Sequence, residues 1–195
     1  MRVLVVYAHP VPGSFNAAVL GRVRAGLGRA GHEVDVVDLH AVDFDPVLPV
    51  DEWQVEYDPA DADPILSDHI ARLLRADALV FVHPTWWGGQ PAVVKGWIDR
   101  VFANGAAYDR LAHKNRVRGR LGNIRRLAVV ATHGSSKLVN LVQGEPGKVT
   151  VLRQLRLLCH RRCRRQWLAF YNGDRAGDEE RRAFLIRVED AFARW

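Results

Sequence analysis

The sequence predicts an α/β fold in which one parallel sheet of five strands is covered by helices on both faces. Apolar segments at 2–7, 78–83 and 127–132 lack polar alternation, as expected for strands buried on both sides. Segments with helical spacing lie between the strands, and hairpin signals are mostly missing. Right-handed crossovers then favour the strand order 2-1-3-4-5, in one domain over residues 1–195.

The individual elements follow from periodicity and capping signals. The helix expected over 14–30 has Ser14 at its N-cap position and Gly31 just after its end. A long irregular connection at 39–64 contains four prolines, and its aromatic residues are expected to be buried. These aromatic residues are Phe44, Trp53 and Tyr57. The remaining strands are expected at 33–38 and 166–171, and the remaining helices at 68–75, 91–103, 147–160 and 178–194.

Composition places the chain among globular proteins: 48% of residues are hydrophobic and 26% are charged. No apolar run approaches the roughly 20 residues that span a bilayer, so we expect no membrane insertion. The apolar start of the chain ends at His9 and Pro10, too early for a signal peptide. A cytoplasmic protein is therefore expected.

Cysteine and arginine content bears on metal and nucleic-acid binding. Cys159 and Cys163 are the only cysteines, and two reduced thiols at a helix end are favoured over a disulfide or a metal site. The net charge of +6 comes mostly from arginine, with basic runs at 116–126 and 161–165. These runs could attract anions, but they lack interleaved aromatic residues. A solvated basic surface is favoured, and no nucleic-acid partner is expected.

One apparent motif is set aside. Gly26, Gly28 and Gly31 spell GxGxxG, the dinucleotide-binding fingerprint. That fingerprint works only where the glycines follow a strand and open a helix, so that backbone amides face a pyrophosphate. Here the glycines end a helix and precede a strand, so the spacing is a coincidence.

The loop after the first strand is a candidate phosphate site. Ligands of open α/β sheets bind outside the carboxyl ends of the strands, and a helix that opens there presents unpaired N–H groups. Ser14 and Asn16 add side-chain donors, and His9 could add another. The alternative is structural: Ser14 only caps the helix, His9 satisfies a carbonyl group and Phe15 belongs to the core.

Two further loops lie at the same predicted edge. Pro84, Thr85, Trp86, Trp87 and Gly88 combine a flat aromatic wall with backbone amides, which suits a planar heterocycle, although paired tryptophans also often bury a core edge. The third loop, with Thr132, His133 and Gly134, offers N–H and O–H groups or is an ordinary turn. The convergence of three polar, glycine-bearing loops is the strongest signal in the chain.

These residues also carry a resemblance. The strings His9-x4-Ser14-Phe15-Asn16, Phe44-Asp45-Pro46, Pro84-x-Trp86-Trp87-x3-Pro91-Ala92-x2-Lys95-Gly96-Trp97-x2-Arg100-Val101-Phe102 and Gly105-x2-Tyr108 resemble the NAD(P)H quinone oxidoreductase (DT-diaphorase-like) family. The match covers roughly the first 110 residues and continues more weakly through Thr132 to Ser136. The resemblance implies a three-layer, flavodoxin-like fold.

The resemblance also implies a function. It implies a homodimeric enzyme that binds FAD, with FMN as second choice, and passes hydride from NADH or NADPH to a quinone or a related small acceptor. His9, Ser14, Phe15 and Asn16 would hold the flavin phosphates. The residues from Pro84 to Trp87 and from Thr132 to Gly134 would line the ring. Tyr108 would reach the acceptor pocket of the partner subunit, and Lys95, Gly96 and Trp97 lie on the helix that resembles the family's dimer interface.

The chain departs from the family in one loop. The better-known eukaryotic members have a catalytic tyrosine and histidine beyond the Thr132 position, whereas residues 137–146 contain neither. His133 is the candidate substitute; otherwise protons come from water or the acceptor is not a simple quinone. The rival functions are a flavodoxin-type electron carrier, which is usually acidic, an ancillary regulatory subunit of a membrane transporter, and a DNA-binding protein.

Overall fold

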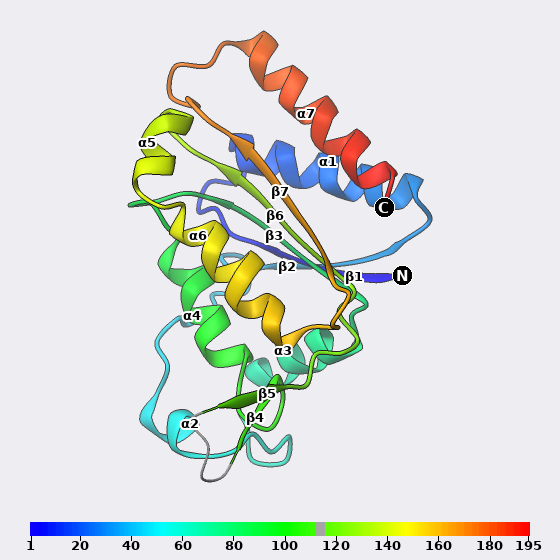
Figure 1. The fold of residues 1–195 in the computed structure, drawn as a ribbon, viewed down its shortest axis with the longest axis vertical. Helices are drawn as coiled ribbons and strands as arrows, with labels where there is room; N and C mark the ends of the chain where they lie inside the picture. Colours follow the sequence, from blue (N-terminus) through cyan, green and yellow to red (C-terminus); the bar gives the residue numbers. More distant parts are fainter. Residues whose placement is uncertain (112–115) are drawn as a thin grey trace.

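The computed structural model describes residues 1–111 and 116–195, which form a three-layer α/β structure (Figure 1). A parallel sheet of five strands lies at its centre in the order β2-β1-β3-β6-β7. The strands are β1 (Arg2–Tyr7), β2 (Glu33–Asp38), β3 (Ala78–Pro84), β6 (Arg126–Thr132) and β7 (Arg164–Phe170). This is the predicted order 2-1-3-4-5, so the predicted fold class is confirmed.

Helices cover both faces of this sheet. On one face lie α1 (Phe15–Arg29) and α7 (Asp178–Ala193); on the other lie α3 (Pro64–Arg75), α4 (Ala92–Val101) and the helical stretch after α5 (Figure 1). Alternate side chains of β3 enter two separate cores: Leu79 and Phe81 pack toward α4, and Val80 and Val82 pack toward α1. All four are essentially unexposed, which explains why this strand shows no polar alternation.

The glycines of the discarded GxGxxG motif serve helix packing and helix termination. Gly26 lies where α1 meets α7, and a Cβ atom there would collide with the Glu189 carbonyl group and the Phe192 side chain. Gly31 has a φ of +72° and follows the C-cap Ala30, as a terminating glycine does. The motif therefore has no part in ligand binding.

The connection between β2 and α3 is anchored to α4. The Arg100 guanidinium group donates to both carboxylate oxygens of Glu52 and, at 2.7 Å, to the Asp45 carbonyl group. Pro46 packs so closely on Gly96 that any Cβ atom there would collide with it. Trp97 is fully buried and donates to His69 Nδ1 at 2.9 Å. The string that carries the resemblance therefore also anchors the loop within the subunit.

Two of the three aromatic residues in this connection reach the core as predicted, and one does not. Phe44 is buried and Tyr57 packs against the core, as predicted. The prediction for Trp53 is wrong, because its side chain is 60% exposed under the Arg110 guanidinium group. Trp53 belongs to α2 (Val50–Gln54), a helix too short to bring a residue onto the core, and none of its residues is buried.

Several other elements differ from the sequence prediction. The helix expected at 147–160 is divided into α6 (Pro146–Val149), the π-helix η1 (Thr150–Gln154) and the 3-10 helix η2 (Leu155–Leu158). Besides α2, three elements were not predicted, because each is short or lacks a clear period. These are the antiparallel strands β4 (Tyr108–Arg110) and β5 (Val117–Gly119), and the helix α5 (Lys137–Val142). Helix α3 begins four residues early, because Asp63 caps it and Pro64 occupies its first turn.

Candidate functional site

Three loops meet at the carboxyl edge of the sheet and are joined by hydrogen bonds. Thr132, which ends β6, is the centre: its hydroxyl oxygen accepts from Asn16 Nδ2 at 2.9 Å, and its carbonyl group accepts from the Thr85 N–H at 2.7 Å. Thr85 Oγ1 also lies 3.4 Å from His133 Nε2. The structure therefore brings together the three loops that the sequence placed at one edge.

The first loop presents the amino end of α1. Ser14 caps the helix: its Oγ accepts from the Ala17 N–H at 3.2 Å and lies 3.5 Å from the Tyr7 hydroxyl group. His9 Nδ1 lies 3.1 Å from the Val11 nitrogen and 3.2 Å from the Val11 carbonyl oxygen, so it either accepts from the N–H group or donates to the carbonyl group. Phe15 packs against Phe170 at 5.0 Å, so its backbone N–H is the group left for a ligand.

Asn16 carries an unpaired polar atom into this edge. The residue is 5% exposed, and its Nδ2 is used by Thr132. Its Oδ1 is buried and has no hydrogen-bond partner among the described residues. A buried acceptor without a partner is unfavourable and marks a position where a ligand donor would fit.

The second loop is a tight turn that exposes two tryptophans. Trp86 and Gly89 exchange backbone hydrogen bonds at 3.1 Å, and both central residues have positive φ, +50° at Trp87 and +79° at Gly88. Trp86 is 44% exposed and Trp87 is fully exposed. The alternative that this pair buries a core edge is therefore wrong. Pro84 is buried at the end of β3, opposite Thr132.

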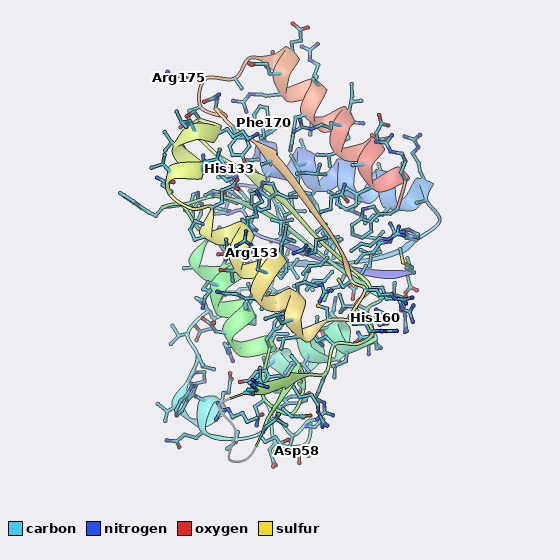
Figure 2. The ribbon with its side chains drawn as sticks, in the orientation of Figure 1. Asp58, His133, Arg153, His160, Phe170 and Arg175 are labelled. Atoms are coloured by element: carbon cyan, nitrogen blue, oxygen red, sulfur yellow. The ribbon has the colours of Figure 1, made fainter. Side chains whose placement is uncertain are left out.

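His133 belongs to the third loop and lies next to α5, near the ends of β6 and β7 (Figure 2). Its ring is 4% exposed, and its Nδ1 lies 2.7 Å from Asn140 Oδ1. Burial lowers the pKa of His133, so the ring is neutral at pH 7. Gly134 has no positive φ; the Asp174 carboxylate lies against it and leaves no room for a Cβ atom.

A second layer of polar residues supports His133. Tyr171 stacks on the imidazole with ring centroids 4.7 Å apart, and its hydroxyl donates to Glu145 at 2.6 Å. Lys148 donates to the other Glu145 oxygen at 2.6 Å. Burial alone would raise the pKa of Glu145, but the hydrogen bonds from Lys148 and Tyr171 outweigh it and hold that pKa below its usual range. Glu145 adopts a φ of +45°, so backbone strain is concentrated where this layer is built.

Tyr108 lies elsewhere in the subunit. It is half-buried on β4 and lines a cavity of about 330 Å³ between the long connection and α4, together with Trp53, Tyr57 and Asp58. Figure 2 shows Asp58 at the opposite end of the molecule from His133. Of the predicted site residues, Tyr108 is therefore the one that the fold keeps apart from the three loops.

Sequence reasoning missed the residues that support His133. They come from three short segments, and they are Asn140, Glu145, Lys148, Tyr171 and Asp174. Tyr171 directly follows β7, a strand that was predicted, so its place at the same edge could have been found. Asn140 and Glu145 could not be placed, because they lie within and just after α5, a helix of six residues with four exposed apolar side chains.

The remaining candidates give no second site. Cys159 follows η2, Cys163 precedes β7, and both are free thiols. No group of three potential metal-ligating His, Cys, Asp or Glu residues occurs in residues 1–111 and 116–195. Within the same residues, no helix combines the length and apolar character needed to cross a bilayer.

Comparison with known sequences identifies relatives of this architecture. The model of a family described by its flavodoxin-like fold matches residues 1–185. NAD(P)H dehydrogenase (quinone) 1 of Cavia porcellus is 30% identical over 168 residues, which cover 77% of this chain and 60% of the relative. An uncharacterized NAD(P)H oxidoreductase of Haemophilus influenzae is 35% identical over 109 residues, or 55% of this chain and 54% of the relative. The chain thus spans little more than half the length of these curated relatives.

Solved structures match over the whole chain. The Smu.1420 protein of Streptococcus mutans is 31% identical, with a TM-score of 0.87 and complete coverage of both chains. NAD(P)H:quinone oxidoreductase from Methanothermobacter marburgensis is 27% identical, with a TM-score of 0.83 and coverage of 99% of this chain and 98% of that one. Both likenesses support the observed fold, and the name of the second structure agrees with the resemblance seen in the sequence.

Proposed function

Because the chain belongs to the family of proteins with a flavodoxin-like fold, we propose that it is a flavin-dependent NAD(P)H oxidoreductase that reduces a quinone or a related small acceptor. Relatives named for this activity support the proposal. The observation that carries it is the junction at Thr132, where the anion-binding end of α1 lies next to an exposed tryptophan turn. That arrangement suits a ligand with an anionic tail and a flat ring.

The residues present fit such a group. Within the described residues, the backbone N–H groups of Phe15 and Asn16 have no hydrogen-bond acceptor, and the positive end of the α1 dipole favours phosphate. The Ser14 hydroxyl group and the His9 ring would be further donors at this end of α1. The unpaired Asn16 Oδ1 suits a hydroxyl donor such as those of a ribityl chain. We propose FAD as the flavin, with FMN as the alternative.

The second and third loops would hold the ring. Trp86 and Trp87 offer aromatic faces, and the turn at Gly88 leaves backbone amides at the same place. Once bound, the flavin would supply the hydride chemistry, while the protein supplies orientation and electrostatics. His133 cannot contact an acceptor directly because it is buried, so its proposed role is to position the groups in front of it.

The acceptor would lie on an apolar surface next to the tryptophan turn. Helix α5 exposes Leu138 and Val142, which are 71% and 82% accessible. The Gln143 side chain at the end of α5 approaches Gly88, so this helix borders the turn. A flat, weakly polar acceptor such as a quinone suits such a surface. We also propose a homodimer, because only a second copy could bring Tyr108 to this edge.

The test is direct. The purified protein is incubated with FAD and with FMN, the unbound flavin is removed, and absorbance and mass of the released cofactor are measured. We expect a yellow 1:1 complex that loses colour with NADH or NADPH without oxygen and regains it with 1,4-benzoquinone. A protein that stays colourless with both flavins contradicts the proposal.

A further inference from the structure

Asn140 is a buried amide whose orientation is fixed by its neighbours. It is 2% exposed, and its Nδ2 donates to the Ser136 carbonyl group at 2.8 Å and to Ser135 Oγ at 3.0 Å. Because a carbonyl oxygen can only accept, the amide nitrogen must be on this side. Asn140 Oδ1 therefore faces His133 Nδ1 at 2.7 Å and accepts its proton.

This contact determines the tautomer of His133. An amide oxygen cannot donate, so Nδ1 carries the ring proton. Burial keeps the ring neutral, and a neutral imidazole has only one N–H. Nε2 is therefore an acceptor, and the Thr85 hydroxyl, 3.4 Å away, is its donor.

The Thr85 hydroxyl has one proton, and that proton is used by His133. We infer that Asn140 and His133 together fix the Thr85 oxygen as an acceptor-only group at the ring-binding edge, so that the site selects the reduced form of a flavin, with its additional ring N–H, over the oxidised form. Asn140 and His133 are positioning residues in this scheme, and Thr85 is the group that touches the ligand.

The inference rests on the proposed function for its ligand. Two-electron reduction of an isoalloxazine adds N–H donors where the oxidised ring has bare acceptor nitrogens. An acceptor-only oxygen accepts a hydrogen bond from the N–H that reduction adds, whereas it faces the nitrogen lone pair of the oxidised ring. We expect Thr85 to favour the reduced form about tenfold, which for a two-electron couple equals about 30 mV in the midpoint potential.

The Thr85 oxygen remains an acceptor as long as His133 keeps its neutral Nδ1–H form, which depends on the groups packed around the ring. Tyr171 stacks on one face of the ring, and Trp167 approaches edge-on at 5.9 Å. The charge of Glu145, beyond Tyr171, is compensated by Lys148 at 2.6 Å. His83 behind the ring is itself neutral at pH 7, because burial lowers its pKa to about 4. Burial of His133 outweighs the Asn140 hydrogen bond and the Glu145 charge, which both raise its pKa, so the ring stays in the neutral Nδ1–H form.

The first test needs no flavin. Long-range ¹⁵N–¹H NMR of the histidine rings in the wild-type protein distinguishes the two neutral tautomers, with His133→Gln used to assign the signal. We expect the Nδ1–H form at pH 7.5. An Nε2–H tautomer or a charged ring overturns the inference.

The second test measures the dissociation constants of oxidised and reduced flavin. Thr85→Val keeps the side-chain shape but removes the oxygen, and should abolish the preference for the reduced form, a tenfold change in the ratio of the two constants. Thr85→Ser, which keeps the hydroxyl group, should retain the wild-type preference for the reduced form. Asn140→Leu should reduce the ratio in the wild-type background but not in Thr85→Val, because Asn140 acts through Thr85.

Tyr171→Phe is the matched control, because it keeps the ring stack and loses the hydroxyl, with its hydrogen bonds to Glu145 and from Trp167 Nε1. We expect its ratio of dissociation constants to stay within twofold of wild type. Flavin binding with a ratio unchanged by Thr85→Val overturns this inference and leaves the proposed function intact. A protein that binds no flavin overturns both.

Discussion

Ser14 combines two roles that one substitution can separate. Its side chain caps α1, and its position at the amino end of that helix makes it a neighbour of any bound phosphate. Aspartate is an equally good cap, so Ser14→Asp should leave the free energy of unfolding nearly unchanged. Its charge about 5 Å from a phosphate would cost about 3 kcal/mol at an effective dielectric constant near 20.

We therefore expect Ser14→Asp to weaken flavin binding about a hundredfold in fluorescence titrations. Ser14→Asn is the neutral control, since it caps as well and carries no charge. Equal affinities for the two variants would show that the phosphate does not lie at the end of α1.

Trp87 is strained and contributes little to folding. It has a φ of +50°, a region unfavourable for a bulky side chain, and its side chain is fully exposed. Trp87→Gly should therefore raise the free energy of unfolding by about 1 kcal/mol in urea titrations, while flavin affinity falls. A variant with lower stability would show that the side chain makes contacts that offset the strain.

At the scale of an element, Arg100 holds the connection between β2 and α3 in place. Its side chain is 10% exposed, and a lysine cannot reproduce its two-pronged contact with Glu52 and the further bond to Asp45. We expect Arg100→Lys to lose about 2 kcal/mol of stability and to make residues 48–63 cleavable in limited proteolysis.

Lys95 on the same helix provides the comparison for Arg100. Its ion pair with Asp99 is exposed, so Lys95→Ala should change the free energy of unfolding by less than about 0.5 kcal/mol. Similar proteolysis patterns for the two variants would refute the anchoring role of Arg100.

The sequence predicts elements well where burial dictates the pattern. The ends of β1 and β2 were predicted to the residue, because both strands lie in the sheet and are bounded by clear turn signals. The ribbon of β4 and β5 could not be predicted, since its six residues are mainly polar and lie outside the five-stranded sheet. The π and 3-10 turns at 150–158 depend on tertiary packing, which helical periodicity does not reveal.

The same contrast holds for the candidate site. The three loops were predicted because they follow strands whose order was predicted, and their convergence is a property of the sheet. The polar residues behind His133 were not predicted, because Asn140 and Glu145 are placed by the short helices α5 and α6 and by backbone strain at Glu145. Tyr108 was predicted to reach the pocket from a partner subunit, and that remains a prediction.

At the scale of the whole molecule, buried histidines link stability to pH. His83 is fully buried, and burial lowers its pKa from 6.5 to about 4. Between these values the unfolded chain binds a proton that the folded chain does not, so stability falls as pH falls below about 6.5. At about 1.4 kcal/mol per unit, His83 alone accounts for about 3 kcal/mol lost by pH 4.

Urea titrations at pH 7.5 and pH 4.5 would measure this loss. His69 and His133, whose pKa values are also lowered by burial, act in the same direction. His83→Leu should remove most of the His83 contribution and flatten the pH dependence, even if its stability at pH 7.5 is lower. A slope equal to wild type would show that His83 does not titrate as the structure indicates.

The junction at Thr132 has a consequence for the resistance of the protein to proteolysis in a cell. One of the hydrogen bonds that define it, from Asn16 to Thr132, joins residues 116 positions apart in the chain, so a short fragment of the fold cannot form the junction. Ligand occupancy is thereby coupled to cooperative unfolding, and a ligand at a hundred times its dissociation constant adds about 2.7 kcal/mol of protection. The supply of that ligand would then set how long each newly made copy survives proteolysis.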